Sequence, residues 1–247
     1  MGFRSPEKVE SKDRHWGFVG HTPVMFRSLR FVVSLVVVGG SALFAESSRF
    51  EDQILQFERE DAESPVEPGG IVFVGSSSIR RWSNLEEAFP TVGPVLQRGF
   101  GGSRMRDLIE VADRIVFPYR PSVIVVYEGD NDLAAGMTPS EVESDFVEFL
   151  DLVRERLPES RVLILAVKPS FSRWKLLPEI EEANAALIRL AVGRGKVEFV
   201  DVFSAMLGAR KSLARDDFVK DGLHLSEKGY ETWIEVITPW LEGAMGR

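Results

Sequence analysis

The sequence predicts an α/β domain in which helices cover both faces of a five-stranded parallel sheet. Five short apolar runs, rich in β-branched residues, alternate along the chain with segments whose apolar residues recur at helical spacing. These runs are apolar throughout, as expected for parallel strands that are buried on both faces. In such sheets ligands bind beyond the carboxyl ends of the strands, so we expect functional residues in the loops that follow them.

Composition narrows the possible functions. The chain has 247 residues, 44% of them hydrophobic, which is enough to build the core of one domain or at most two. Its net charge of −8 argues against a nucleic-acid partner, which would need a basic surface. The chain has no cysteine, and this excludes a cysteine nucleophile, zinc–thiolate sites and iron–sulfur clusters.

The first 45 residues differ in kind from the rest. In residues 25–45, two arginines precede an apolar run (31–44) that ends near small residues, which is typical of a secretory signal peptide cleaved after Ala45. An uncleaved membrane anchor at 31–44 is the alternative, although this run is short for a membrane span. Residues 1–24 are polar, and we interpret them as a mis-assigned or disordered extension ahead of the true start at Met25. We therefore expect a periplasmic or secreted protein with no stable membrane association once the signal peptide is removed.

The N-terminal half is expected to contain two strands. Phe50, Ile54 and Phe57 have helical spacing and predict a short amphipathic helix that packs on the domain, followed by a Pro- and Gly-rich linker to residue 70. The domain proper, 71–247, opens with a strand at 71–74, and a helix is expected to begin at 79–82. A second strand begins at 95–96, and Ser103 is the expected N-cap of the next helix.

The C-terminal half repeats the alternation. Further strands are expected at 123–127, 162–167 and 197–202. Residues 138–141 form a capping box that starts a helix ended by Pro158, and a later helix is closed by Gly193. A last helix is predicted from 226 to about 241, broken or kinked at Pro239.

Three residues have the chemistry of a nucleophilic site. Ser77 lies in a strand–Gly–Ser–helix junction, which can present a small side chain above the edge of a sheet. His224 is the one histidine after residue 45, and Asp221 precedes it by three residues, so one tight turn can bring the carboxylate to the imidazole. The alternatives are a serine that only caps a helix and a histidine in an ordinary surface turn.

Two further positions could stabilise a developing negative charge. The Gly101–Gly102 pair closes a strand and lets a backbone N–H group approach a substrate without an intervening Cβ. Asn131 follows a buried strand and offers a neutral donor. With the N–H group of Ser77, these would make three donors for an oxyanion, although each could also be ordinary turn chemistry.

Four blocks together resemble the SGNH, or GDSL-type, hydrolase family. They are Gly75–Ile79, Gly99–Gly102, Gly129–Asp132 and Asp221–His224, and they occur in the family's order. The resemblance is closest to the branch that includes the platelet-activating-factor acetylhydrolases and many exported bacterial esterases.

The resemblance implies a flavodoxin-like three-layer α/β/α sandwich and a serine esterase without a metal or cofactor. It implies Ser77 as nucleophile, with His224 and Asp221 completing a triad, and an oxyanion hole made by Ser77, Gly102 and Asn131. Ser76 stands where most members have aspartate, which leaves Ser76 and Ser78 as alternative nucleophiles.

The substrate is expected to be a short acyl ester, such as an acetyl group on a small molecule or glycan. No long apolar insertion is present that could form a lid over a fatty chain. Arg173 and Trp174 follow the fourth strand, and with Asp130 they are candidate substrate-binding residues. The alternatives are a lysophospholipase or thioesterase of the same fold, and a non-catalytic carbohydrate-binding member.

Overall fold

The computed structural model describes residues 2, 40–209 and 211–246, with side chains described from Arg49 onward. The predicted extension 1–24, apart from residue 2, and residues 25–39 of the predicted signal peptide lie outside the described residues.

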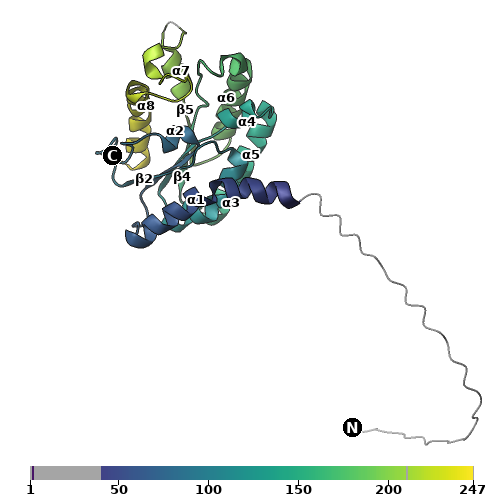
Figure 1. Cartoon of the computed structure of the whole chain (residues 1–247). Coiled ribbons are helices and arrows are strands. Elements are labelled where there is room, and N and C mark those ends of the chain that lie inside the picture. The colour runs from purple at the N-terminus through teal and green to yellow at the C-terminus, as the bar shows by residue number, and fades with distance from the viewer. Residues whose placement is uncertain (1, 3–39, 210, 247) are drawn as a thin grey trace, which may run out of the picture. The chain divides into compact units, whose positions relative to one another are not determined.

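The centre of the domain is a sheet of five strands, and all of their pairings are parallel. The order across the sheet is β2-β1-β3-β4-β5, so the chain builds outward from β1 in both directions (Figure 1). The strands are β1 Ile71–Gly75, β2 Val95–Gly99, β3 Val123–Tyr127, β4 Arg161–Leu165 and β5 Val197–Val200. The predicted five-stranded parallel sheet is confirmed.

Helices form a layer on each face of this sheet (Figure 1). Successive strand residues point to opposite faces, so that Val72 and Val74 join one core cluster while Ile71 and Phe73 join the other. The first cluster is covered by α1 Gly40–Glu63, α3 Met105–Ile115, α5 Pro139–Arg156 and α6 Leu177–Val192. The second is covered by α2 Ser77–Arg80, α7 Val202–Leu207 and α8 Glu227–Ala244. A short helix, α4 Asp130–Ala134, follows β3, and 3₁₀ turns occupy Phe117–Tyr119, Trp174–Leu176 and Arg215–Asp217.

The α1 helix is part of this packing. Phe50 and Ile54 are buried in the first core cluster. Arg114 of α3 forms ion pairs with Glu51 at 2.8 Å and Glu58 at 2.6 Å, which lie on the same side of α1. The point at which signal cleavage is predicted, after Ala45, falls within the first two turns of this helix. None of the helices in the described ranges is long and apolar enough to cross a bilayer.

Several sequence expectations about helix and strand ends were wrong. Arg104, not Ser103, is the N-cap of α3, because the buried Ser103 hydroxyl is bonded instead to Phe100 O and to Glu128. The last helix was expected to be broken or kinked at Pro239; it is not broken there and continues to Ala244. Strands β4 and β5 end two residues earlier than predicted, at Leu165 and Val200. The segment 79–82 does not open a long helix, since α2 is a single turn that ends at Arg80.

The end of β1 approaches β3 closely enough to require glycine. Gly75 has φ +132°, and a Cβ atom on it would lie 2.0 Å from Tyr127 O. No side chain fits there, because the neighbouring atom is backbone. This approach brings the residues after β1 and those after β3 to the same edge of the sheet.

Candidate active site

Ser77, His224 and Asp221 form one hydrogen-bonded chain at the carboxyl edge of the sheet. His224 Nε2 lies 3.0 Å from Ser77 Oγ, and His224 Nδ1 lies 2.7 Å from Asp221 Oδ2. When Nδ1–H donates to the carboxylate, Nε2 is left as the acceptor for the serine hydroxyl. The structure therefore brings together a hydroxyl group, an imidazole that can accept its proton and a carboxylate that orients the imidazole.

The turn from Asp221 to His224 holds the carboxylate in its ionised form. Its Oδ1 accepts the backbone N–H groups of Leu223 at 2.8 Å and His224 at 3.0 Å. Although desolvation opposes it, the hydrogen bonds from the His224 ring and from these two amides keep the pKa of Asp221 well below its usual range. An ionised Asp221 can stabilise an imidazolium on His224 when the base takes up a proton.

The neighbouring serines do not reach the histidine. Ser76 and Ser78 are buried, and neither hydroxyl has a hydrogen-bond partner among the described residues. Tyr230 of α8 donates to Ser78 O at 2.8 Å, which ties the turn to the helix behind it. Ser77 is therefore the serine whose hydroxyl has a base beside it.

A cavity of about 670 Å³ opens over Ser77 and His224, and Gly102 and Asn131 contribute to its wall. Gly102 has φ +86°, a conformation that side chains disfavour, while space around its missing Cβ is open. Asn131 Nδ2 donates to Ser103 O at 2.8 Å, and Asn131 Oδ1 accepts from Arg173 Nη2 at 2.6 Å. These two bonds determine which way the amide points, and they leave one N–H of Nδ2 available.

A buried ionic cluster stands behind Asn131. Asp130 pairs with Lys168 Nζ at 3.1 Å and with Arg173 Nη1 at 3.0 Å, and Lys168 also contacts Tyr127 OH. Burial alone would raise the pKa of Asp130, but the two cations hold it below its ordinary value. Asp130 and Arg173, predicted as substrate contacts, are thus bonded to each other and do not line the cavity. Trp174 is 45% exposed and lies outside the cavity wall as well.

Two further buried carboxyl groups follow β3, those of Glu128 and Asp132. Glu128 is fully buried, and Ser103 Oγ lies 2.6 Å from its Oε1. Desolvation, with the nearby charge of Asp132, raises the pKa of Glu128 well above its usual value. Desolvation also raises the pKa of Asp132 to about 6, despite the N–H groups of Met105 and Gly129 that it accepts.

Sequence reasoning missed several residues that support the site. Ser172 Oγ donates to Asp221 O, and its N–H group donates to Gly222 O at 3.1 Å. The loop after β4 thus makes two contacts with the site. Ser172 contacts the turn that carries His224, and Arg173 contacts Asn131. The available sequence signal was Lys168, which directly follows the predicted strand 162–167, because a lysine at the end of a buried strand needs an acidic partner.

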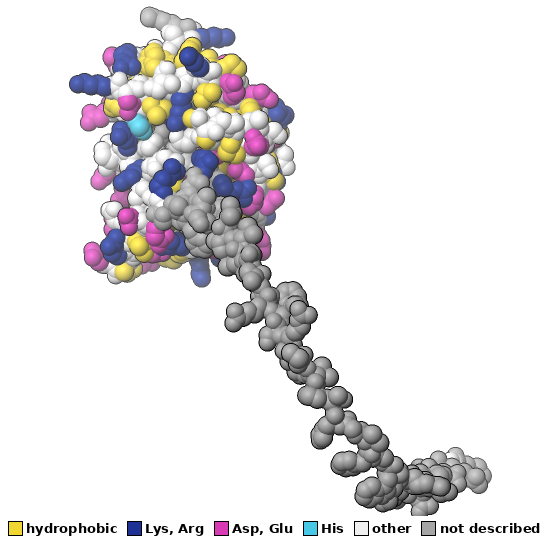
Figure 2. All heavy atoms as spheres, turned by 45° about the vertical axis from the view of Figure 1, so that its right-hand side comes forward, with side chains coloured by type: hydrophobic (Ala, Val, Ile, Leu, Met, Phe, Trp, Pro, Cys, Tyr) yellow, Lys and Arg dark blue, Asp and Glu magenta, His cyan; other side chains and the backbone are white. Residues whose placement is uncertain are grey.

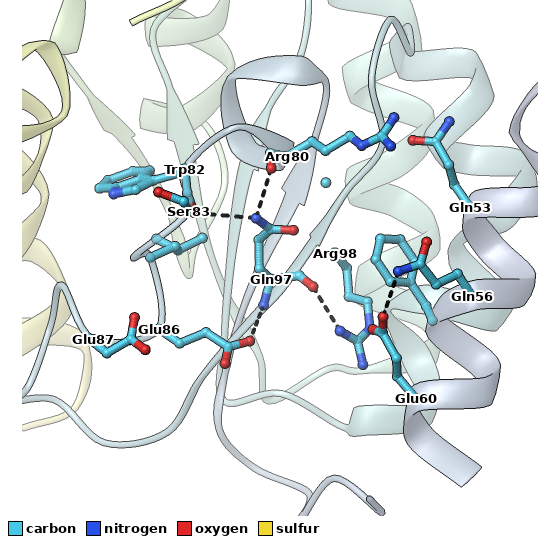
Figure 3. A pocket seen from close by; sticks show the side chains of 13 residues that line it. Gln53, Gln56, Glu60, Arg80, Trp82, Ser83, Glu86, Glu87, Gln97 and Arg98 are labelled. Atoms are coloured by element: carbon cyan, nitrogen blue, oxygen red, sulfur yellow. Dashed lines mark hydrogen bonds between the residues drawn. The ribbon is translucent and has the colours of Figure 1, made fainter. Parts of the chain in front are cut away.

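A polar groove of about 320 Å³ lies beside the cavity, between α1 and the segment that follows α2 (Figure 3). Three amide side chains line it, Gln53 and Gln56 from α1 and Gln97 from β2. Gln97 Nε2 donates to Arg80 O at 3.2 Å, and Figure 3 shows the Arg80 side chain extending toward Gln53. Arg80 lines both this groove and the cavity over Ser77. Within the described part of the chain, no cluster of three His, Asp or Glu side chains could hold a metal ion.

Curated proteins from animals and plants resemble this chain at the sequence level. The human platelet-activating factor acetylhydrolase IB subunit alpha1 is 27% identical over 173 residues, which cover 68% of this chain and 74% of the human protein. The GDSL esterase/lipase WDL1 of Oryza sativa subsp. japonica is 28% identical over 214 residues, covering 72% of this chain and 80% of the rice protein.

Solved structures share the fold. A GDSL-like lipase from Bacteroides thetaiotaomicron superposes with a TM-score of 0.63 at 21% identity, covering 81% of this chain and 99% of the other. A variant of an acetyl-xylooligosaccharide esterase from Geobacillus gives a TM-score of 0.58 at 15% identity, covering 74% and 96%. The predicted SGNH hydrolase fold is thereby confirmed. The profile of the GDSL-like lipase/acylhydrolase family matches residues 71–232, more than half of the chain. The chain belongs to this family of ester-bond hydrolases.

Proposed function

We propose that the chain is an exported serine esterase that removes short acyl groups, such as acetyl, from a polar alcohol. The observation that carries this proposal is the chain of contacts from Ser77 Oγ through His224 to Asp221 at the floor of an open cavity. Ser77 is the nucleophile, His224 the general base, and Asp221 the residue that orients His224.

The reaction is acyl transfer in two steps. His224 Nε2 takes the hydroxyl proton as Ser77 Oγ bonds to the ester carbonyl carbon, and then returns that proton to the leaving alcohol as the ester C–O bond breaks. In the second step His224 deprotonates a water molecule, which attacks the acyl–serine and releases the carboxylic acid. Each proton that His224 accepts is held beside the ionised Asp221.

Three donors meet the oxyanion of each tetrahedral intermediate. They are the N–H groups of Ser77 and Gly102 and the free N–H of Asn131 Nδ2. The bonds from Arg173 and to Ser103 support this role for Asn131, because they orient its amide before substrate arrives. Donors that need no reorganisation contribute most to stabilising developing charge.

The surroundings of the cavity favour a polar alcohol. The adjoining groove is lined by amides and charged groups, including Gln53, Gln56 and Glu60, which suit hydroxyl groups better than an acyl chain (Figure 3). One structural relative is an acetyl-xylooligosaccharide esterase. An acetylated glycan is the substrate class that these features support best.

The test compares hydrolysis of p-nitrophenyl acetate and p-nitrophenyl octanoate by residues 46–247 and by the Ser77→Ala variant. We expect acetate to be hydrolysed faster, and the substitution to lower kcat by several orders of magnitude. Activity that survives Ser77→Ala would contradict the assignment of the nucleophile. Faster turnover of octanoate would favour the lysophospholipase or thioesterase alternative.

Export has a separate test. The run of residues 31–44 after two arginines supports cleavage after Ala45. N-terminal sequencing of the protein from its native host should begin at Glu46. A mature chain that retains residue 31 would favour the membrane-anchored alternative instead.

A further inference from the structure

The entrance to the cavity is basic on a protein that is acidic overall. Arg80 and Arg81 line the cavity over Ser77. A second hollow of about 310 Å³ shares Gly102 with this cavity and is lined by Arg49 and Arg104. Neither lining includes an aspartate or glutamate, although the chain has a net charge of −8. Figure 2 shows Lys and Arg side chains close to the histidine on this face.

Arg104 is paired with Asp107 at 3.8 Å, whereas Arg80, Arg81 and Arg49 are only weakly neutralised by the protein. Among the described residues, no carboxylate lies within 4.0 Å of the Arg80 guanidinium. Arg81 lies 4.0 Å from Asp221 Oδ2, an oxygen already bonded to His224, and both side chains are about half exposed. Arg49 donates to Gly102 O at 3.1 Å and stacks on Phe50. A positive field therefore remains at the entrance.

Arg80 lies beside Gly101, on the same side of the cavity as Ser77. It follows Ser77 by three residues on α2, and both flank Gly101: a Cβ atom on Gly101 would lie 3.3 Å from Arg80 Nη1 and 4.0 Å from Ser77 Cβ. Gly101 in turn donates its N–H to Gln53 Oε1 at 3.2 Å. The guanidinium thus stands where the cavity meets the polar groove, whose own lining includes Glu60, Glu86 and Glu87. Its planar set of donors matches carboxylate and phosphate oxygens.

We infer that this site selects esters whose alcohol part carries a negative charge, a carboxylate or a phosphate, close to the ester bond. Arg80 binds the anionic group directly, while Arg81 and Arg49 attract it from a longer distance. The negative charge must lie on the alcohol part of the ester, because a short acyl group such as acetyl carries no ionisable group. The inference rests on the proposed esterase function and specifies its substrate class.

The test uses acetate esters that differ mainly in charge: 4-acetoxybenzoate, its neutral methyl ester, and 4-acetoxyphenyl phosphate. Each kcat/KM is divided by the rate of alkaline hydrolysis of the same ester, which removes differences in intrinsic reactivity. We expect the wild-type protein to prefer an anionic ester over the neutral one by roughly tenfold or more, the size of one charge-assisted hydrogen bond. The relative rates of the two anionic esters show whether the site suits carboxylate or phosphate.

The variants assign the preference to Arg80. Arg80→Gln should lower the ratio of normalised kcat/KM for the anionic ester to that for the neutral ester roughly tenfold. Arg80→Lys should retain part of the preference for the anionic ester. Arg189→Gln makes the same charge change on an exposed residue of α6 and should leave the ratio unchanged. Added salt should reduce the wild-type preference, since surface charges are screened.

The outcomes separate this inference from the esterase assignment. Equal normalised rates on anionic and neutral esters, or an equal loss on both in Arg80→Gln, would overturn the inference and leave the esterase standing. Activity that survives Ser77→Ala would overturn the esterase assignment instead. Isothermal titration of Ser77→Ala with 4-acetoxybenzoate and its methyl ester measures recognition without turnover, and equal affinities there would also overturn the inference.

Discussion

At the scale of single residues, the orientation of Asn131 depends on groups that do not line the cavity. Arg173 Nη2 donates to Asn131 Oδ1, and Arg173 is itself held by the buried Asp130. Asp130 is held in turn by Lys168. Without Arg173, the Asn131 amide could rotate and present its carbonyl oxygen to the cavity, where it would repel an oxyanion. Arg173 is therefore a positioning residue in the proposed mechanism.

Arg173→Gln should lower kcat for p-nitrophenyl acetate by roughly tenfold to a hundredfold with a smaller change in KM, because the oxyanion develops only after binding. Asn131→Ala should lower kcat further than Arg173→Gln does, since it removes the hydrogen-bond donor itself. In the double variant, Arg173→Gln should add little to the loss already caused by Asn131→Ala. Losses that multiply in full would show that Arg173 acts independently of Asn131.

At the scale of secondary structure, α1 completes the core on one face of the sheet. Its buried residues Phe50 and Ile54 pack in the same cluster as α3, and Arg114 clamps the two helices together through Glu51 and Glu58. Gln53 of the same helix reaches the Gly101 N–H beside the cavity. The helix therefore contributes to stability and to the wall of the polar groove.

Ile54→Ala should lower the free energy of unfolding by about 2–5 kcal/mol, because it removes a fully buried side chain and leaves a cavity. Chemical denaturation followed by circular dichroism measures this change. Leu55→Ala is the matched control, because Leu55 neighbours Ile54 but is 40% exposed. This substitution should lower the free energy of unfolding by less than about 1 kcal/mol. Equal effects of the two substitutions would mean that α1 does not pack as described.

At the scale of the whole molecule, buried carboxyl groups just beyond the end of β3 make stability depend on pH. The pKa of Glu128 is raised well above its usual value and that of Asp132 to about 6, in both cases chiefly by desolvation. The folded protein therefore holds protons that the unfolded chain releases near pH 4. Asp221 acts in the opposite direction, because its lowered pKa favours the folded state above that pH.

For a raised carboxyl pKa, the stabilising contribution is complete below the unfolded pKa and is lost as the pH rises toward the folded pKa. We therefore expect the contribution of Asp132 to decline between about pH 4 and 6, and that of Glu128 to decline further above this range. Glu128→Gln, which keeps the neutral shape, should raise Tm at pH 8 and leave it nearly unchanged at pH 4. A lower Tm for Glu128→Gln at pH 8 would mean that Glu128 is ionised in the folded protein.

Much of the fold and site could be predicted because the signals are local. Apolar runs such as 123–127 marked the strands, and the capping box at Thr138 marked the start of α5 at Pro139. The short turn from Asp221 to His224 could be read directly, since both residues lie within one turn of chain. The sequence shows a glycine at position 75 but not why one is required there. The reason is that a Cβ atom would collide with Tyr127 O of the neighbouring strand.

The sequence by itself thus determined the α/β class, the order of its strands along the chain, and which residues could carry out ester hydrolysis. Only the tertiary structure decided that Ser77, rather than Ser76 or Ser78, meets His224, a contact across 147 residues. It also showed that Arg173 bonds to Asn131 instead of lining the cavity, and that Arg80 stands at the entrance. The physical reason is that backbone patterns depend on neighbours in sequence, whereas side-chain contacts depend on which loops the sheet brings together.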